Sequence, residues 1–298
     1  MIQRFLDYIT IERRYSPLTA RAYEQDLCEF CSFLHVAPEA LDPKMVTDAD
    51  IKAWMISLLD AGESPRTVRR KLSSLRSFWR FLLRIGYVEK DVTRGVIAPK
   101  TDKPLPVFFK DREMQDAEQT MEWANDFRSI RDSLVIDILY QTGMRRAELA
   151  GLKDGDIDLS RMEVRVFGKR RKERIVPFGE ALAERIRTYQ QSRNDEFGLT
   201  TAPAQPLILD MHGRAATVNT IYKIVRARMG EVSSLKKHSP HVLRHTFATQ
   251  LLNNGADINT IKTLLGHANL AATQIYTHTT FDQLRNAYLQ AHPRASRS

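Results

Sequence analysis

Residues 98–106 divide the chain, because this segment can belong neither to a helix nor to a strand. It reads Ala-Pro-Lys-Thr-Asp-Lys-Pro-Leu-Pro and has no apolar periodicity. Proline fixes its own backbone, lacks an N–H and pushes the preceding residue out of the helical region, so the segment favours an extended linker. A chain of 298 residues is also long for a single core. We therefore expect two domains, residues 1–97 and 107–298, joined by this linker.

The first domain is expected to be entirely helical. Its clearest helix is Pro65–Ile85, for which Ser64 is an N-cap, Pro65 occupies the first helical position and Gly86 follows the end. The remaining periodic segments are Ile2–Arg13, Pro17–Leu34 and Asp48–Asp60, and Thr47 or Asp48 can cap the last of these helices.

Composition narrows the class of partner. The formal net charge of +9 is spread over the chain and favours a polyanion such as nucleic acid. No apolar run approaches the roughly 20 residues of a membrane helix, so we expect a cytoplasmic protein without a membrane partner.

The two cysteines, Cys28 and Cys31, lie three apart within a helical pattern and lack a second ligand pair, which favours packing over a metal or redox role.

The helix Pro65–Ile85 has two different faces. Apolar residues recur at three and four positions and form one stripe, Val68, Leu72, Leu75, Trp79 and Leu82. No acidic residue occurs between Glu63 and Glu89, and like charges repel one another unless an anion compensates them. A solvated face is the ordinary alternative, but such faces normally mix signs. We expect DNA-backbone contacts from Arg66, Arg69, Arg70, Arg76 and Arg80.

The second domain combines helices with a small hairpin. Residues 162–167 and 174–177 alternate with period two around a Gly- and Lys-rich turn, which predicts a β-hairpin. The other periodic segments are helical: Ile130–Tyr140, Arg145–Leu152, Ala181–Gln190, Thr217–Met229, His241–Asn253, Asp257–Leu265, Leu270–Thr277 and Phe281–Gln290. The fold class expected for the whole chain is mainly α with a small β-sheet.

Several polar residues of this domain suit chemistry on a phosphodiester. Arginine holds phosphate oxygens with a planar fork that stays charged, a hydroxyl can attack phosphorus, and a leaving oxygen needs a proton donor. His241 and Arg244 are three apart on one predicted helix and therefore share a face. Each residue alone could be structural. His278 is a weaker alternative to His267, and Tyr288 is a weaker alternative to Tyr276. The candidate set is Arg145, Lys169, His241, Arg244, His267 and Tyr276.

Five sequence blocks, in order, carry a resemblance to a known family. They are Thr142–Leu149, Gly168-Lys169 before Lys172-Glu173-Arg174, His241–Thr249, Leu264–His267 and Tyr276–His278. Together they look like the signature blocks of tyrosine site-specific recombinases, also called the phage integrase family. The resemblance covers nearly the whole chain, and its length and linker look like the cellular XerC/XerD group, with a lean towards XerC.

That resemblance implies a division of roles. Arg145, His241, Arg244 and His267 would hold the scissile phosphate, Lys169 would protonate the leaving 5′ oxygen, and Tyr276 would form a 3′-phosphotyrosyl intermediate. Lys172 is the alternative proton donor. The fold implied is a helical core-binding, SAM-like domain followed by a mixed α/β catalytic domain. No metal and no cofactor are implied.

The same resemblance suggests partners and a cellular task. We expect resolution of chromosome dimers at dif-like sites during segregation and cell division, by a heterotetramer with a second Xer recombinase, with a division-associated DNA translocase as a possible partner. The apolar stripe of Phe281–Gln290 suggests that this helix packs into a neighbouring protomer, with docking on its own domain as the alternative.

Three other functions remain open at this point. An integrase or transposase of a mobile genetic element would share the chemistry. A type IB topoisomerase would use a similar tyrosine without pairing two DNA sites. A catalytically silent DNA-binding protein would have no use for the complete set of residues.

Overall fold

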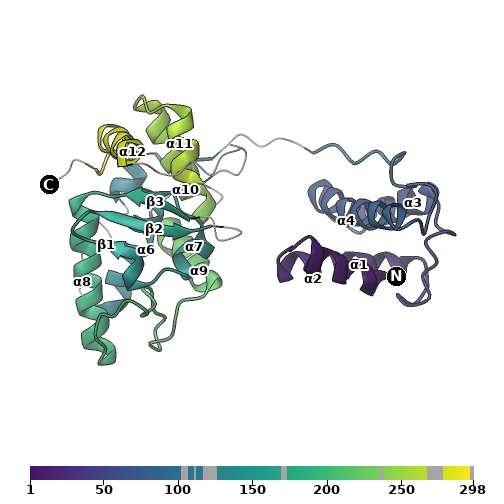
Figure 1. Cartoon of the computed structure of the whole chain (residues 1–298), viewed down its shortest axis with the longest axis horizontal. Helices are drawn as coiled ribbons and strands as arrows, with labels where there is room; N and C mark the ends of the chain where they lie inside the picture. The colour runs from purple at the N-terminus through teal and green to yellow at the C-terminus, as the bar shows by residue number, and fades with distance from the viewer. Residues whose placement is uncertain are drawn as a thin grey trace. The chain divides into compact units, whose positions relative to one another are not determined.

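The computed structural model describes residues 1–101, 107–110, 112–116, 126–168, 173–233, 235, 238–266 and 278–295, apart from the side chains of residues 278–283. Its chain forms two compact units, Met1–Pro104 and Leu105–Ser298. The structure is mainly helical with one three-stranded sheet, so the predicted fold class is confirmed (Figure 1).

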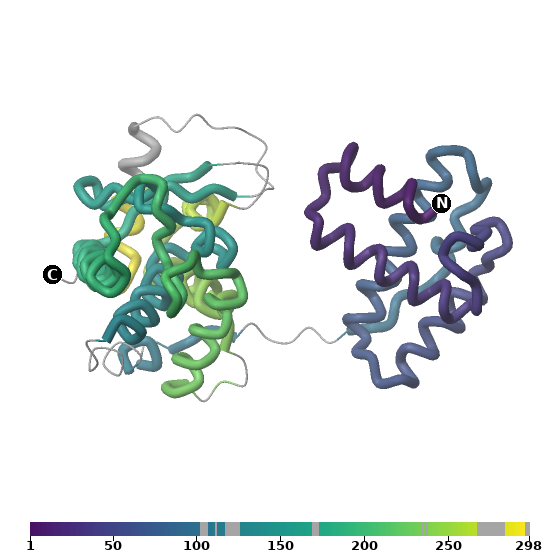
Figure 2. The backbone as a smooth tube through the Cα atoms, turned by 90° about the horizontal axis from the view of Figure 1, so that it is seen from below, coloured from purple at the N-terminus to yellow at the C-terminus, as the bar shows by residue number. Residues whose placement is uncertain are grey.

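The first unit is a bundle of helices around one core (Figure 2). Its α-helices are α1 (Ile2–Asp7), α2 (Pro17–Phe33), α3 (Asp48–Asp60) and α4 (Pro65–Arg84). The expected first helix is not uniform, because a π-helical turn over Tyr8–Glu12 follows α1. Helix α4 is capped as predicted, since the Ser64 hydroxyl accepts the N–H of Thr67. The Ser16 hydroxyl caps α2 in the same way by accepting the N–H of Thr19.

Large aromatic residues fill the core of this unit. Phe30, Trp54 and Trp79 are buried, and the Phe30 ring contacts those of Trp54 and Trp79 at centroid distances of 5.0 and 6.3 Å. Cys31 is buried in the same core and packs there as a small apolar side chain, whereas Cys28 is half-buried. Burial raises the pKa of the Cys31 thiol to about 11.

The second unit is built around helix α6 (Phe127–Thr142), almost all of which is buried. It packs against α8 (Glu180–Phe197), α9 (Val218–Val232) and α10 (Pro240–Asn253). Strands β1 (Ile157–Asp158), β2 (Glu163–Phe167) and β3 (Glu173–Pro177) form an antiparallel sheet in that order. The predicted hairpin is β2–β3, and the sequence did not indicate the two-residue β1.

Strand β3 contacts two of the helices not yet described. Helices α11 (Ile258–Leu265) and α12 (His278–Ala291) both contact β3, as Figure 1 shows at one side of the sheet. Short α7 (Arg146–Ala150) lies after α6 and contacts α9. The predicted helix Leu270–Thr277 lies outside the described residues.

Candidate active site

Arg145 is placed by a sharp turn between two helices. Gly143 ends α6 in the left-handed conformation, with a φ of +59°, and Arg145 then acts as the N-cap of α7. A Cβ at Gly143 would lie 2.5 Å from Cδ1 of Phe247, so the turn requires glycine for space as well as for conformation. The backbone N–H of Arg145 donates to Oε2 of Glu148 over 2.7 Å, and its guanidinium donates to Oε1 over 2.8 Å.

Arg244 joins this turn from α10. Its two terminal nitrogens donate to the carbonyls of Gly143 and Leu265, each over 2.6 Å. The side chain is buried, and desolvation, helped by the charges of Arg145 and Arg174, lowers its pKa to about 10. It therefore stays charged at neutral pH, and packs the end of α6 against the end of α11.

A buried carboxylate connects the arginines. Arg174, on β3, donates to both oxygens of Glu148 over 3.1 and 2.8 Å. Burial alone would raise the pKa of Glu148, but the hydrogen bonds and charge of Arg174, with those of Arg145, outweigh it and lower that pKa. Glu148 is thus ionised between two guanidiniums, and that of Arg244 lies nearby. The cluster keeps an excess of positive charge, which suits an anion.

Exposure separates the members of this cluster. The side chain of Arg145 is 40% exposed, whereas those of Glu148 and Arg174 are each 5% exposed. The exposed part of the Arg145 guanidinium can therefore contact a ligand, while the buried Glu148 and Arg174 hold it in position. His241 lies in the first turn of α10, after Ser239 and Pro240, and is also exposed. Its spacing of three residues places it on the helix face of Arg244.

Sequence reasoning missed the roles of Glu148 and Arg174. Two signals could have revealed them. Glu148 lies three residues after Arg145, a position from which a carboxylate can accept the backbone N–H of the N-cap residue, and it does so here. Arg174 occupies an inward position of an alternating strand, where an apolar residue would be usual.

Lys169, His267 and Tyr276 lie outside the described residues, as does Lys172. The structure does describe Gly266, the residue that precedes His267 in the sequence. Gly266 ends α11 in the left-handed conformation, with a φ of +63°, and a Cβ there would lie 3.2 Å from Cδ of Arg174. Strand β3 and the end of α11 therefore meet at Arg174, beside the Arg145 turn.

In this structure the C-terminal helix docks on its own unit. Leu284, Tyr288 and Ala291 are buried in the core of that unit, which is the alternative to the expected packing into a neighbouring protomer. The Tyr288 ring stacks on His292 at 5.1 Å, and burial raises the pKa of its hydroxyl. Tyr288 is therefore unsuited to be a nucleophile, which removes it as an alternative to Tyr276.

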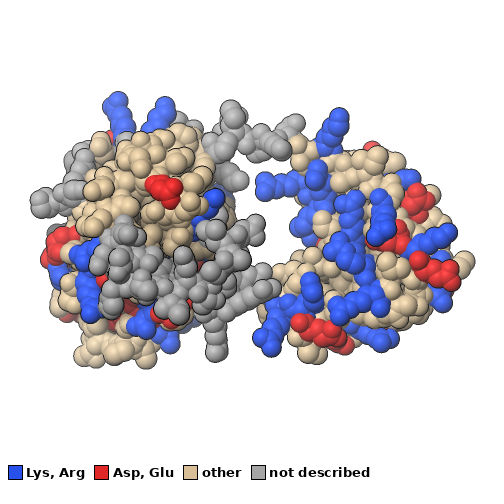
Figure 3. Space-filling model, turned by 45° about the horizontal axis from the view of Figure 1, so that its top comes forward, with Lys and Arg blue, Asp and Glu red and all other residues tan. Residues whose placement is uncertain are grey.

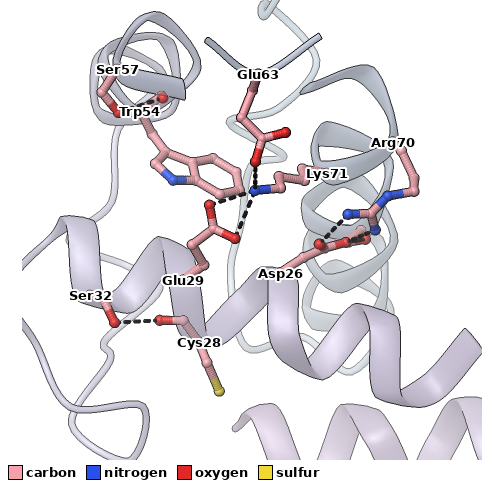
Figure 4. Close-up of polar contacts among 10 residues, drawn as sticks. Asp26, Cys28, Glu29, Ser32, Trp54, Ser57, Glu63, Arg70 and Lys71 are labelled. Carbon is pink, nitrogen blue, oxygen red and sulfur yellow. Dashed lines mark hydrogen bonds and ion pairs between the residues drawn. The ribbon is translucent and has the colours of Figure 1, made fainter. Parts of the chain in front are cut away.

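Some of the cationic side chains of α4 are paired with other residues of the first unit. Lys and Arg side chains gather on the face of the first unit in Figure 3, and Arg66, Arg69 and Arg80 are exposed. Arg70, however, forms a two-pronged ion pair with Asp26 of α2 (Figure 4), whose hydrogen bond raises the pKa of Arg70. The assumption that nothing compensates the face is therefore wrong at this position.

Other cations of α4 also have internal partners, among them Arg69, whose guanidinium donates to the carbonyl of Pro99 over 3.3 Å. The Arg76 guanidinium donates to the carbonyl of Val96 over 2.7 Å. Lys71 is buried, and its ammonium donates to Glu29 and Glu63 over 2.6 and 3.0 Å (Figure 4). The surface available to a polyanion is therefore smaller than the sequence suggested.

No described helix is long and apolar enough to cross a membrane. Within the described part of the chain, no group of three or more His, Cys, Asp or Glu residues could hold a metal ion.

Comparison with known proteins gives matches in both units. Residues 112–283 match the model of the phage integrase family, and residues 2–86 match the phage integrase N-terminal SAM-like domain. The tyrosine recombinase XerC of Listeria innocua is 39% identical, over 98% of this chain and 97% of that protein. XerC of Chlorobaculum tepidum is 37% identical, over 98% and 94% of the two chains.

Two solved structures share the fold. The Tn1549 transposon integrase in complex with transposon right end DNA has a TM-score of 0.70 at 19% identity, covering 96% of this chain and 97% of that one. A lambda integrase dimer bound to a COC′ core site has a TM-score of 0.66 at 18% identity, covering 90% and 93%.

Proposed function

The chain belongs to the phage integrase family as a site-specific tyrosine recombinase, an enzyme of DNA strand exchange, and we propose that Tyr276 is its nucleophile. In the proposed reaction the Tyr276 hydroxyl loses its proton to solvent as its oxygen attacks the scissile phosphorus, and the bond from phosphorus to the 5′ oxygen breaks. Lys169 gives its proton to that leaving oxygen. The product is a 3′-phosphotyrosyl link and a free 5′ hydroxyl.

Arg145, His241, Arg244 and His267 are proposed to hold the phosphate. The observation that carries this assignment is the Arg145 turn: a half-exposed guanidinium held by Glu148, with Arg244 beside it. Charge builds up on the two non-bridging oxygens in the transition state, and prearranged cations stabilise it most in a site with few mobile waters.

This chemistry runs without cofactor or ATP. The covalent link conserves the free energy of the phosphodiester, so the 5′ hydroxyl of a second strand can attack it and release Tyr276, whose oxygen takes a proton back from solvent. The proton then returns to the amine that gave it.

We further propose that residues 1–97 form the core-binding domain, residues 98–106 the linker and residues 107–298 the catalytic domain. The two domains would close around duplex DNA. In the first domain the exposed Arg66 and Arg80 are the best candidates for phosphate contacts. Arg69, Arg70 and Arg76 would contribute charge while holding internal partners.

The cellular task proposed is resolution of chromosome dimers at a dif-like site. This would need a heterotetramer with a second Xer recombinase, and a DNA translocase of the division apparatus as activator. Chromosomal DNA as substrate places the enzyme in the cytoplasm. Mobile-element integrases are less favoured, since the Tn1549 and lambda integrases are 19% and 18% identical, whereas the two XerC relatives are 37% and 39% identical over 98% of this chain.

A nicked duplex tests the nucleophile. With a dif-like site nicked so that cleavage loses a short strand, the full chain should form a covalent protein–DNA adduct that survives a denaturing gel. Tyr276→Phe should form none. Tyr288→Phe is the matched control and should form a normal amount, because the Tyr288 hydroxyl is buried with no hydrogen-bond partner in the described structure. An adduct that persists in Tyr276→Phe would overturn the assignment.

A further inference from the structure

Arg174 lies at the meeting point of the candidate site, although it is not one of the six proposed catalytic residues. It is the second residue of β3 and its side chain is 5% exposed, so it does not reach a bound DNA. All three of its guanidinium nitrogens donate: Nη1 and Nη2 to Glu148, and Nε to the carbonyl of Leu264 over 2.8 Å. One planar group thus connects α7 to α11.

The first of these connections controls Arg145. Glu148 accepts the backbone N–H of Arg145 on Oε2 and its guanidinium on Oε1. The same two oxygens receive the fork of Arg174. Because a two-pronged pair fixes the plane of the carboxylate, Arg174 determines the direction in which Glu148 holds Arg145.

The second connection controls the end of α11. The last carbonyls of a helix have no partner within the helix. Here Arg174 satisfies that of Leu264, and Arg244 satisfies that of Leu265. Gly266 follows at once in the left-handed conformation and packs on the Arg174 side chain. The two arginines therefore fix the turn that precedes His267 in the sequence.

We propose that Arg174 is a positioning residue for strand cleavage, which orients Arg145 through Glu148 and sets the turn before His267. The proposal rests on the proposed function. Lysine does not reproduce these bonds, because its N–H groups diverge from one nitrogen, whereas Arg174 donates from three separate nitrogens of one planar group. Misplacing a phosphate-binding group slows the chemical step without weakening the many backbone contacts that bind DNA.

The test compares cleavage with binding in the full chain. Arg174→Lys should slow adduct formation at saturating nicked DNA by about 10- to 100-fold, with DNA affinity within about threefold of wild type. The matched control is Arg193→Lys. Arg193 is also a buried arginine paired with a carboxylate, Asp154, but it contacts none of the proposed site residues. Its cleavage rate per folded molecule should stay close to wild type.

A substrate with sulfur in place of the leaving 5′ oxygen separates two routes of action. A thiolate leaves without a proton, so it relieves the need for a general acid. It should not rescue Arg174→Lys, whose defect lies on the non-bridging oxygens. Rescue would mean that Arg174 acts through the Lys169 hairpin, and would overturn the proposal. So would an unchanged cleavage rate.

A double-variant comparison checks the route through Glu148. Glu148→Gln should be slow by itself, and adding Arg174→Lys should slow it little further, because both changes remove the same connection. Losses that multiply would contradict a shared route.

A crystal structure of Arg174→Lys without DNA decides the geometry independently of the reaction. The expected result is a displaced Arg145 guanidinium and an altered turn at Gly266. If Arg145 keeps its 2.8 Å bond to Glu148 and the turn is unchanged, the positioning role is wrong whatever the DNA assays give. If wild type forms no adduct on any DNA, the proposed function fails, and this structure still decides the positioning role.

Discussion

At the scale of single residues, identical side chains have different tasks. Arg145 is 40% exposed, whereas Arg174 is 5% and Arg244 9% exposed, although all three lie at the turn between α6 and α7. The sequence identified Arg145 and Arg244 because the resemblance to the family gives both of them a role in holding the phosphate. Arg174 stands in one of the same blocks but received no role, since its partners lie 26 and 90 residues away and only the fold brings them together.

The glycine turn before Arg145 yields a stability prediction. Gly143→Ala should lower the free energy of unfolding by about 2 to 4 kcal/mol, from left-handed strain and from overpacking against Phe247. Urea unfolding measures this loss. Gly198→Ala is the matched control: its φ of +62° is nearly the same, but a Cβ there meets nothing within 4 Å. It should cost only about 1 to 2 kcal/mol of strain. Equal losses would show that the contact with Phe247 does not matter.

At the scale of elements, local signals predicted the helices better than their packing. Ser64, Pro65 and Gly86 mark the beginning and end of α4 because capping is a local interaction, and alternation marked the β2–β3 hairpin. The C-terminal helix was different. Its apolar stripe correctly required burial, but a stripe does not specify which surface buries it, and in this chain that surface is its own core.

The segment after that helix carries a buried histidine that should respond to pH. His292 stacks on Tyr288 and lies against Tyr140 and Arg294. Its Nδ1 accepts the N–H of Arg294, and Nε2 lies 3.4 Å from the carbonyl of Tyr140, an arrangement that suits the neutral ring. Burial, together with the charge of Arg294, lowers the pKa of His292 from 6.5 to about 3.

The sign of the effect follows from which state binds the proton. Between pH 6.5 and about 3 the unfolded chain takes up a proton that the folded chain refuses, so stability should fall as pH falls below 6.5. His292→Phe should remove up to roughly 1.4 kcal/mol per pH unit of that slope. Urea unfolding from pH 7 to 5 measures it. Replacing the exposed His212 by Phe should leave the slope as in wild type. The same slope in His292→Phe would show that His292 is not the responsible group.

At the scale of the whole molecule, charge is the property that the sequence overestimated. The net charge of +9 correctly indicated a polyanionic partner, and the XerC relatives agree with it. Yet the one-dimensional argument treated α4 as an isolated helix. In the folded unit Asp26 and Glu29 reach Arg70 and Lys71 from α2, which lies more than 40 residues earlier in the chain. Pairing of this kind is decided by tertiary packing, so no local pattern could reveal it.

That pairing decides which arginines should control DNA affinity. Arg66 and Arg80 are exposed on α4 and form no hydrogen bond or ion pair with the residues that the structure describes. Replacing both with Ala should lower the slope of log affinity against log salt by about 2, because each phosphate without its arginine keeps its counterion when the protein binds. Fluorescence anisotropy with a labelled duplex over a range of salt concentrations measures that slope.

Two further variants make the prediction specific to position. Arg161 and Arg187 are exposed arginines of the second unit that already face Asp158 and Glu180. Replacing both with Ala removes the same formal charge but should change the slope by well under 1, because their acidic partners offset them before DNA arrives. If the two double variants lower the slope equally, affinity follows net charge alone and α4 has no special part in it. If only the Arg66 and Arg80 variant does so, the unpaired part of α4 lies against the DNA backbone.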